Sequence, residues 1–321
     1  MTTATPDATP TGESFSPKAP AATALIVLAL LVVYVVWGST YLGIRVVVKE
    51  APPFLGMGAR YLAAGILLGL VLSLRGGLRR LRVTRRELLG CAAVGLLLPV
   101  LGNGLVSVGE NLGAPSGVTA LLIAIAPLMI AIFRFASGDR PRALSVFGLL
   151  LVFAGLAYLI LVGRHTGGDD RVPMGAALIV LFASTCWAFG SWVQPRLTLP
   201  SDAFVLTVHE MWIGGLILLA AGTLGGERFD LGAYSVETYL AWAYLVVFGS
   251  MVAFSAYVWL LGNAPISLVA TYAYVNPVVA VALGALILDE PITSAVVVGG
   301  AVIVASVAIV ISVERVRRTD H

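Results

Sequence analysis

Long apolar runs, separated by short polar or charged clusters, follow one another along nearly the whole chain of 321 residues. A helix needs roughly 20 mostly apolar residues to cross about 30 Å of hydrocarbon, and the runs have this length. Their apolar residues are continuous rather than alternating, which argues against a transmembrane β-barrel. The pattern predicts ten membrane-spanning helices, at residues 23–47, 54–73, 88–108, 115–136, 143–162, 174–194, 203–222, 238–261, 265–287 and 292–313.

The two halves of the chain resemble each other when one is shifted by 150 residues. The shift aligns Trp37 with Trp187 and Pro127 with Pro277. Apolar matches are expected by chance in so apolar a chain, but coincident Trp, Pro and Asp residues indicate an internal duplication. The further matches are Ala114 and Pro115 with Ala264 and Pro265, Asp139 with Asp289, and Pro141 with Pro291.

Each half holds five predicted helices, an odd number, so the second half must enter the membrane in the opposite orientation. The predicted fold class is therefore an all-α integral membrane protein with ten transmembrane helices in two inverted five-helix repeats. Many secondary transporters have such repeats and bind cargo near the midplane between them. The predicted segments are a disordered cytoplasmic tail (1–21), the first repeat (22–162), an external linker (163–173), the second repeat (174–313) and a basic cytoplasmic tail (314–321).

The positions of the 20 Lys and Arg residues predict the orientation of the helices. With a cytoplasmic N-terminus, 14 of them fall on the inside and five on the outside, and Arg60 lies within a span. Six of the inside residues form an Arg-rich loop at 75–86. We therefore expect a multi-pass protein of the cytoplasmic (inner) membrane, surrounded by the lipid bilayer, with both termini in the cytoplasm.

Composition excludes several other classes of protein. Hydrophobic residues make up 59% of the chain and charged residues 12%, whereas soluble domains have about 45–50% and about 25%. Cys91 and Cys186 both lie in apolar runs, which argues against a disulfide framework or a Cys-rich metal site. The motifs H-E-x-x-H, G-x-x-x-x-G-K-[ST] and G-x-S-x-G do not occur. We therefore predict no enzyme activity, catalytic residue, cofactor, metal or nucleic-acid partner.

Arg60, Glu110 and Glu210 are the candidates for charges within the membrane: Arg60 and Glu210 lie about seven residues into their predicted helices, and Glu110 lies at the outer end of a third. Such charges cost on the order of 3 kcal/mol and normally face a cavity or a partner. The shift superposes Arg60 and Glu210, each roughly 10 Å deep from opposite membrane faces. Each could be a substrate-binding or proton-coupling group, or a structural residue satisfied by carbonyls or by snorkelling. His209 adjoins Glu210 but points about 100° away around the helix, so the two are not a preformed acid/base pair.

Other polar and aromatic residues in the spans are candidates for lining a substrate cavity. Asn103, Ser107 and Glu110 follow i, i+4, i+7 spacing and form one polar stripe, which either binds cargo or joins helices. Trp37 and Trp187 lie about 14 residues into their runs, too deep for an interfacial belt, so they line a cavity or pack between helices. Thr40 and Tyr41 follow Trp37 within the same helix.

Two prolines are predicted to kink helices in mid-membrane. Pro127 and Pro277 each lack a backbone donor and clash with the preceding turn, which frees a carbonyl that a ligand, a side chain or water must satisfy. Both kinks are therefore expected to border a cavity. Tyr272 and Asn276 share one face beside the second kink and are candidates for cargo contact.

Six stretches of this sequence, spread over residues 37–291, together resemble the EamA branch of the drug/metabolite transporter superfamily, and within it the YedA-type bacterial inner-membrane transporters. The resemblance implies two EamA repeats and a central cavity lined by helices from both halves. It favours export of small metabolites or drug-like compounds. The matching stretches are Trp37-Gly-Ser-Thr-Tyr-Leu-Gly-Ile-Arg45, Pro52-Pro53, Gly102-Asn-Gly104, Ala114-Pro-Ser-Gly117, Trp187-Ala-Phe-Gly-Ser191 and Tyr272-Ala-Tyr-Val-Asn-Pro-Val278.

These observations predict a secondary active transporter that exports small molecules across the cytoplasmic membrane by alternating access, with a proton as the candidate coupling ion. An uptake carrier of the same fold is the alternative, since direction leaves no mark in the sequence. An integral-membrane enzyme or receptor fits less well, because paired carboxylates and metal ligands are missing. The expected partners are a small-molecule substrate, the bilayer and a proton, and a homodimer stays open.

Overall fold

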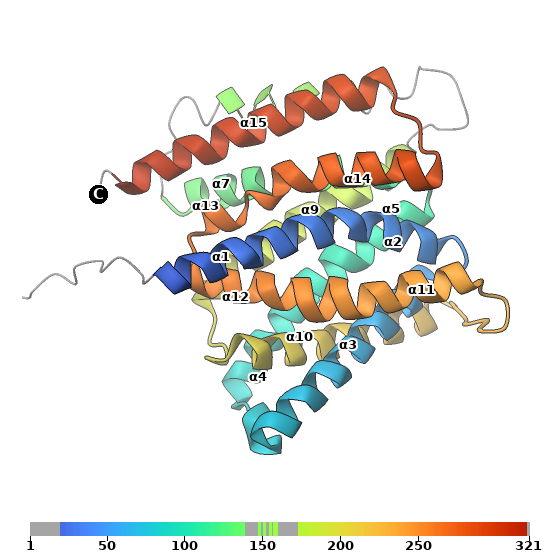
Figure 1. The fold of residues 1–321 in the computed structure, drawn as a ribbon, viewed down its shortest axis with the longest axis vertical. Coiled ribbons are helices and arrows are strands. Elements are labelled where there is room, and N and C mark those ends of the chain that lie inside the picture. Colours follow the sequence, from blue (N-terminus) through green and yellow to red (C-terminus); the bar gives the residue numbers. More distant parts are fainter. Residues whose placement is uncertain are drawn as a thin grey trace, which may run out of the picture.

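A computed structural model describes residues 20–138, 147–148, 150–151, 154–155, 157–159 and 173–319. All regular elements within these ranges are helical, and most of them run side by side across the bundle (Figure 1). The predicted fifth span, 143–162, lies mostly outside the described residues. The predicted all-helical class is confirmed for the part of the chain that the structure describes.

The first four predicted spans form helices that are continuous or briefly interrupted. The first span comprises α1 (Pro20–Val32), η1 (Val33–Trp37) and α2 (Gly38–Val48). The second is α3 (Pro53–Gly76), which the short η2 (Leu78–Leu81) follows. The third comprises α4 (Arg85–Gly95), η3 (Leu96–Gly104) and α5 (Leu105–Asn111), and the fourth α6 (Ser116–Ile123) and α7 (Ala126–Ala136).

The second half follows the same order. Its first helix is α9 (Met174–Val193), extended by η4 (Gln194–Arg196), and its second is α10 (Ala203–Leu224). The third comprises α11 (Val236–Tyr244), η5 (Leu245–Phe254) and α12 (Ser255–Asn263). The fourth is divided into α13 (Ile266–Val269) and α14 (Tyr272–Leu288), and the last is α15 (Ser294–Thr319).

Seven of the described helices are long and apolar enough to cross a membrane. Shorter apolar stretches at Val275–Leu288 and Ser294–Ser306 lie in α14 and α15. Many large apolar side chains on the outside of the bundle are exposed, among them Leu70, Leu150 and Leu286. Since lipid tails are as apolar as these side chains, such a surface is expected of a protein that lies within a bilayer.

The fourth span of each half is interrupted, but in different places. In the first half the break falls at Ala124 and Ile125, and Pro127 is the second residue of the new helix α7, where proline is tolerated. In the second half the break falls at residues 270–271, and Pro277 lies inside α14. The predicted kink at Pro277 is therefore preceded by a complete break six residues earlier.

Three spans contain π-helical segments, which the sequence analysis did not predict. They are η1, η3 and η5, and each lies in the middle of its span. A shift of 150 residues carries the end of η3, Gly104, onto the end of η5, Phe254. π-Helical turns are rare and frequently occur at functional sites. These segments therefore indicate a functional site at the centre of the bundle.

Close backbone contact between α3 and α10 joins the two halves of the chain. A Cβ atom at Gly58 would lie 2.8 Å from the backbone nitrogen of Leu219, and one at Gly215 would lie 2.8 Å from that of Leu62. Only glycine fits at such distances, so these two residues allow the helices to approach closely. An alanine at either position is expected to push the two halves apart.

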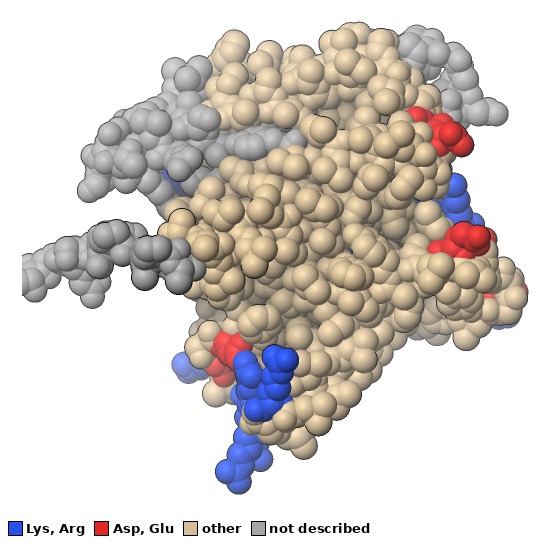
Figure 2. Space-filling view, in the orientation of Figure 1, with Lys and Arg blue, Asp and Glu red and all other residues tan. Residues whose placement is uncertain are grey.

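Charged side chains gather at the two ends of the bundle (Figure 2). Most of the visible basic side chains cluster at the end that holds η2, beside a few acidic ones, and the other visible acidic side chains lie at the opposite end with a basic side chain between them (Figures 1 and 2). We call the first the arginine end. The second, which holds Glu50, Glu227 and Glu290, we call the acidic end. The excess of Arg and Lys on cytoplasmic loops predicts that the arginine end faces the cytoplasm.

A set of topology reporters tests this orientation. Reporters fused after Arg82, Arg140 and Arg318 are expected to be cytoplasmic, and those fused after Arg171 and Gly225 external. The positions alternate in the way that an odd number of helices per half requires. A cytoplasmic reporter after Arg171 would contradict both the orientation and the inverted repeat.

Candidate functional site: a central cavity

A cavity lies at the centre of the bundle, where the π-helical segments of the two halves meet. Trp37 comes from η1, Asn103 from η3 and Phe254 from η5, while Arg60 and Tyr61 come from α3. Both halves of the chain therefore contribute to its walls. The complete lining is Trp37, Thr40, Tyr41, Arg60, Tyr61, Gly102, Asn103, Val106, Ile123, Ala183, Trp187, Phe254 and Tyr272.

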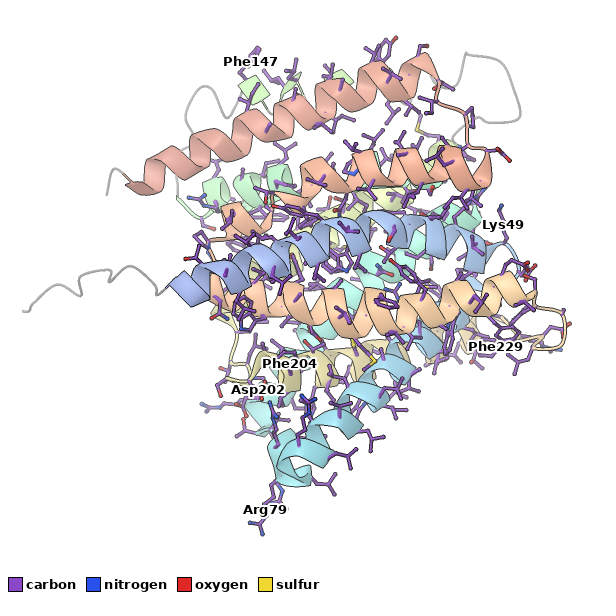
Figure 3. All side chains as sticks on the ribbon, viewed as in Figure 1. Lys49, Arg79, Phe147, Asp202, Phe204 and Phe229 are labelled. Atoms are coloured by element: carbon purple, nitrogen blue, oxygen red, sulfur yellow. The ribbon has the colours of Figure 1, made fainter. Side chains whose placement is uncertain are left out.

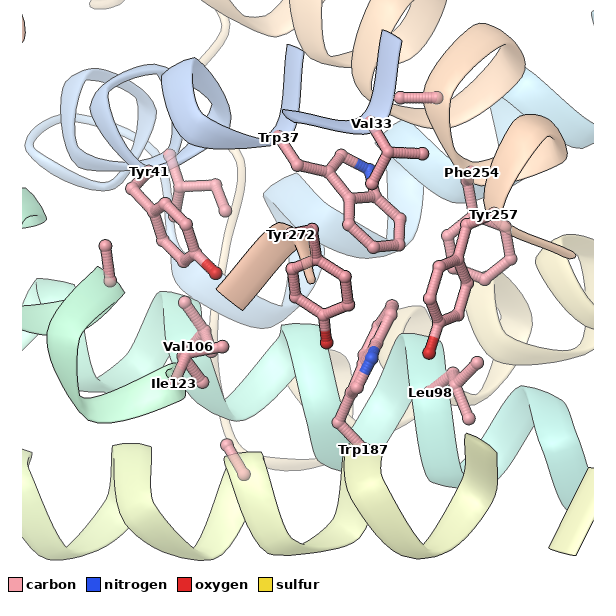
Figure 4. Packing of buried hydrophobic residues seen from close by; sticks show 14 of the residues in the cluster. Val33, Trp37, Tyr41, Leu98, Val106, Ile123, Trp187, Phe254, Tyr257 and Tyr272 are labelled. Carbon is pink, nitrogen blue, oxygen red and sulfur yellow. The ribbon is translucent and has the colours of Figure 1, made fainter. Parts of the chain in front are cut away.

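Aromatic rings form one side of this cavity (Figure 4). The ring centroid of Trp37 lies 5.3 Å from that of Trp187 and 5.6 Å from that of Tyr272, and both pairs are nearly perpendicular. Tyr257 lies behind them, 4.7 Å from Trp37 and 5.9 Å from Tyr272. These spacings are typical of favourable aromatic pairs. The cluster gives the cavity a rigid apolar wall against which a flat or aliphatic group can pack.

Arg60 forms the charged side of the cavity. Its side chain is only 2% exposed, and its Nε donates to Ser250 Oγ at 2.8 Å. Its Nη1 donates to Asn103 Oδ1 at 3.2 Å and to the sulfur of Met57 at 3.6 Å. None of these acceptors is a carboxylate. Among the residues that the structure describes, this buried guanidinium is held by neutral groups, so it is suited to bind an anionic group of a ligand.

Most of the predicted cavity residues lie in this lining. Trp37, Thr40 and Tyr41 line the cavity from the first span, and Asn103, Trp187 and Tyr272 line it from three others. The lining residues that were not predicted carry no polar or charged group that stands out in an apolar span, apart from the Tyr61 hydroxyl: Tyr61, Gly102, Val106, Ile123, Ala183 and Phe254.

Ser107 and Asn276 lie outside the lining. Ser107 Oγ donates to the carbonyl of Gly104 at 2.6 Å, which satisfies it within its own span. The Asn276 amide nitrogen, turned to donate, reaches the carbonyl oxygens of Tyr34 at 3.0 Å and Tyr272 at 3.2 Å. Asn276 therefore joins α14 to η1 beside the cavity rather than facing it.

Glu110 and Glu210 are both fully buried, and neither lines the cavity. Among the described residues, neither carboxyl oxygen of either side chain has a hydrogen-bond partner. Arg45 donates to the backbone carbonyl of Glu110 rather than to its carboxyl group. His209 is also buried, and its Nδ1 lies 2.9 Å from the carbonyl of Val205. The structure thus places two unpartnered carboxyl groups within the bundle.

Arg60 and Glu210 do not form an ion pair. The salt bridge found among the described residues joins Arg80 to Asp202, with 2.7 Å between Nη2 and Oδ2. Glu210 instead lies within electrostatic range of Tyr61, whose hydroxyl also lacks a hydrogen-bond partner among the described residues. Tyr61 lines the cavity and Glu210 does not.

The central cavity is small in this conformation. Its open volume is about 40 Å³, and an ordered water needs about 10–15 Å³ by the same measure. It has room for only a few waters, so a metabolite can enter only after helices or aromatic side chains move. A larger cavity of about 270 Å³ lies near the acidic end, between Val47, Phe229 and Trp242. It is wholly apolar, so the central cavity is the better candidate for orienting a polar ligand.

The fold and the site together define a class of protein: a multi-pass membrane transporter, with a small cavity lined by both halves of the chain. Residues 24–161 and 174–312 each match the EamA-like transporter family. The chain belongs to this family. Among the described residues, no three His, Cys, Asp or Glu side chains gather in a way that could hold a metal ion.

Several bacterial relatives are similar over most of their length. The inner membrane transporter YedA of Escherichia coli K12, named as uncharacterized, is 40% identical over 256 residues, which is 80% of each chain. The probable amino-acid metabolite efflux pump of the same strain is 27% identical, over 83% of this chain and 88% of its own. A solved crystal structure with 20% identity covers 94% of this chain and 99% of its own with a TM-score of 0.63, and it shows the same fold.

Proposed function

We propose that this protein is a secondary active carrier that exports small organic acids with an apolar or aromatic body across the cytoplasmic membrane. The observation that carries the proposal is the central cavity, which Arg60 lines together with the aromatic rings of Trp37 and Trp187. A carboxylate group of the cargo would pair with the guanidinium. The remainder of the cargo would pack against the rings.

Alternating access is the proposed transport mechanism. It is supported by the duplicated family match and by the coincidence of η3 and η5 under the 150-residue shift, which fit two inverted five-helix repeats. In carriers of this kind, one repeat rocks against the other around a site near the midplane. The small volume of the cavity fits an occluded state between two open ones.

Export, rather than uptake, is the proposed direction. One relative carries the name of a probable amino-acid metabolite efflux pump, and amino-acid metabolites include the amphipathic acids that the cavity would suit. The same cavity could serve an uptake carrier, so the direction needs its own test.

Glu210 is the proposed proton-coupling group. A carboxylate that is buried without a partner is costly, so this side chain would hold a proton while it is dehydrated and release it when water enters. Its electrostatic interaction with Tyr61, which lines the cavity, supports a role close to the cargo without direct contact. When the bundle opens, water would reach both Glu210 and the cavity, so the release of a proton from Glu210 and the release of cargo would occur together.

Metabolite profiling of cells and medium tests the direction and the cargo class together. Overexpression is expected to lower one or more amphipathic acids in the cytosol and raise them at least severalfold in the medium. Overexpressed Arg60→Met protein, at equal membrane abundance, serves as the control and should leave both pools unchanged. Accumulation of such an acid inside the cells would show uptake, and a change in neutral compounds alone would contradict the proposed cargo.

A further inference from the structure

Three carboxylates at the acidic end join one half of the chain to helix N-termini in the other half. Glu290, which follows α14, accepts hydrogen bonds from Ser116 N and Ser116 Oγ, both at 2.8 Å, and from Gly117 N at 3.2 Å. Glu227 accepts from Leu55 N at 2.8 Å and from Phe54 N at 3.3 Å. We call these hydrogen bonds, and those of Glu50, the cross-half caps.

Glu50 supplies the third cross-half cap in the opposite direction, from the first half to the second. Its Oε2 accepts from Ser235 N at 2.7 Å and from Ser235 Oγ at 2.9 Å. The backbone hydrogen bond from Ser235 is the main cause that holds the pKa of Glu50 below its usual value. This carboxylate therefore stays ionised, and its cap stays intact, at any pH near neutral.

The local sequence explains why two of these helices need a partner. The first N–H groups of a helix have no acceptor within it. Residues Pro52 and Pro115 precede α3 and α6, and neither provides a side-chain cap. Asp289, in the left-handed conformation with φ of 54°, ends α14 and turns the chain so that Glu290 faces α6. Asp tolerates this conformation better than most residues.

The arginine end is built differently. Asp202 caps its own helix α10 by accepting from Phe204 N at 3.0 Å, and Thr84 and Glu87 form a capping box within α4. A shift of 150 residues carries Glu227 onto Gly77, Glu50 onto Pro200 and Glu290 onto Arg140. None of these three has a side chain that can accept a hydrogen bond. The ion pair that joins the halves there among the described residues, Arg80 with Asp202, is about one-third exposed.

We propose that Glu50, Glu227 and Glu290 are the gating residues of the acidic end, whose cross-half caps hold that end closed and must break before cargo can leave there. The two ends of the carrier are therefore unequal, and its resting state is closed at the acidic end. In Figure 3 the acidic end lies near the labels Lys49 and Phe229, and the arginine end lies near the label Asp202. This inference rests on the proposed alternating access, because only a carrier that opens to both sides needs such a gate.

Cysteine accessibility tests the gate without measuring transport. In a protein with Cys91→Ala and Cys186→Ala, a Val106→Cys substitution places a single thiol in the central cavity, which Val106 lines. A membrane-impermeant methanethiosulfonate reagent is added outside intact cells. If brief openings expose the thiol, the labelling rate reports how often the acidic end is open.

Loss of the caps is expected to raise the labelling rate. Removing a helix cap changes an equilibrium by roughly two- to thirtyfold, so Glu290→Ala should raise the rate about tenfold and the triple alanine variant by more than about thirtyfold. Glu290→Gln keeps one acceptor oxygen and should give a smaller rise. The control is Glu237→Ala, which removes an exposed acidic residue near the same end. Melting temperature and membrane abundance show that the variants remain folded.

An unchanged labelling rate in the folded triple variant would overturn the proposed gate. Transport by that variant would then show that the carrier still works, which separates failure of the gate from failure of the proposed function. An equal rise in the Glu237→Ala control would also overturn it, because the effect would follow lost negative charge rather than broken caps.

Discussion

Replacement of Arg60 with methionine is expected to weaken binding of an amphipathic acid at least about 30-fold, because the cargo carboxylate would lose its buried cationic partner. Methionine has a similar length, can occupy the same apolar surroundings and removes the cost of burying an unpaired charge. Ser250 and Asn103 would each lose one hydrogen bond. Quenching of tryptophan fluorescence measures binding, since Trp37 and Trp187 line the cavity.

Two controls separate the charge from the shape. Arg60→Lys keeps the positive charge but cannot maintain the bonds to Ser250 and Asn103 together, so it should bind with intermediate affinity. The neutral amide of the same acid should bind weakly to the wild-type protein. Its affinity for Arg60→Met should be about the same. Equal loss of affinity for the acid and its amide would show that Arg60 only supports the shape of the cavity.

Replacement of Glu210 with glutamine is expected to abolish transport driven by a proton gradient while cargo exchange without a gradient continues. Glutamine keeps the shape of the side chain but cannot bind or release a proton. Glu110→Gln is the matched control, because Glu110 is also fully buried with both carboxyl oxygens unpartnered among the described residues. Transport in proteoliposomes with and without an imposed pH difference distinguishes the two variants. Gradient-driven transport by Glu210→Gln at the wild-type rate would rule out its coupling role.

The charge-swapped protein with Arg60→Glu and Glu210→Arg tests the remaining alternative, a pair of opposite charges that stabilise each other. The structure contains no ion pair between these residues, so each swapped charge would lie in surroundings built for the other. We expect neither binding nor gradient-driven transport to recover. Recovery of both would establish a functional charge pair between α3 and α10.

Seven of the predicted spans match described helices that are long and apolar enough to cross a membrane, because a bilayer imposes one length and one composition on every crossing helix. Helix ends were less predictable, since they depend on caps. The third span begins at Arg85, before its apolar run, because Thr84 and Glu87 form a capping box. The positions of the breaks before α7 and α14 could not be predicted from the sequence, because a proline restricts a helix without specifying where the helix is interrupted.

The candidate site was predictable where a residue conflicts with its surroundings. Arg60, Asn103 and Trp187 were identified because a charge, an amide and a deep Trp are unusual within a span. Asn276 met the same criterion and was predicted to contact cargo, but its side chain bonds to backbone carbonyls instead. The sequence alone does not show which way a helix is rotated, so it could not reveal this. The role of Glu290 depends on contact with a distant helix, so no local pattern revealed it.

Efflux from liposomes containing only the purified protein tests the central claim most directly. The liposomes are loaded with an acid that metabolite profiling has shown to be exported, and its release is followed after an outward gradient is imposed. Wild-type protein should release the acid at a saturable rate that Arg60→Met reduces at least about 30-fold. Release at the same rate from liposomes with wild type, with Arg60→Met and without protein would contradict transport through the central cavity.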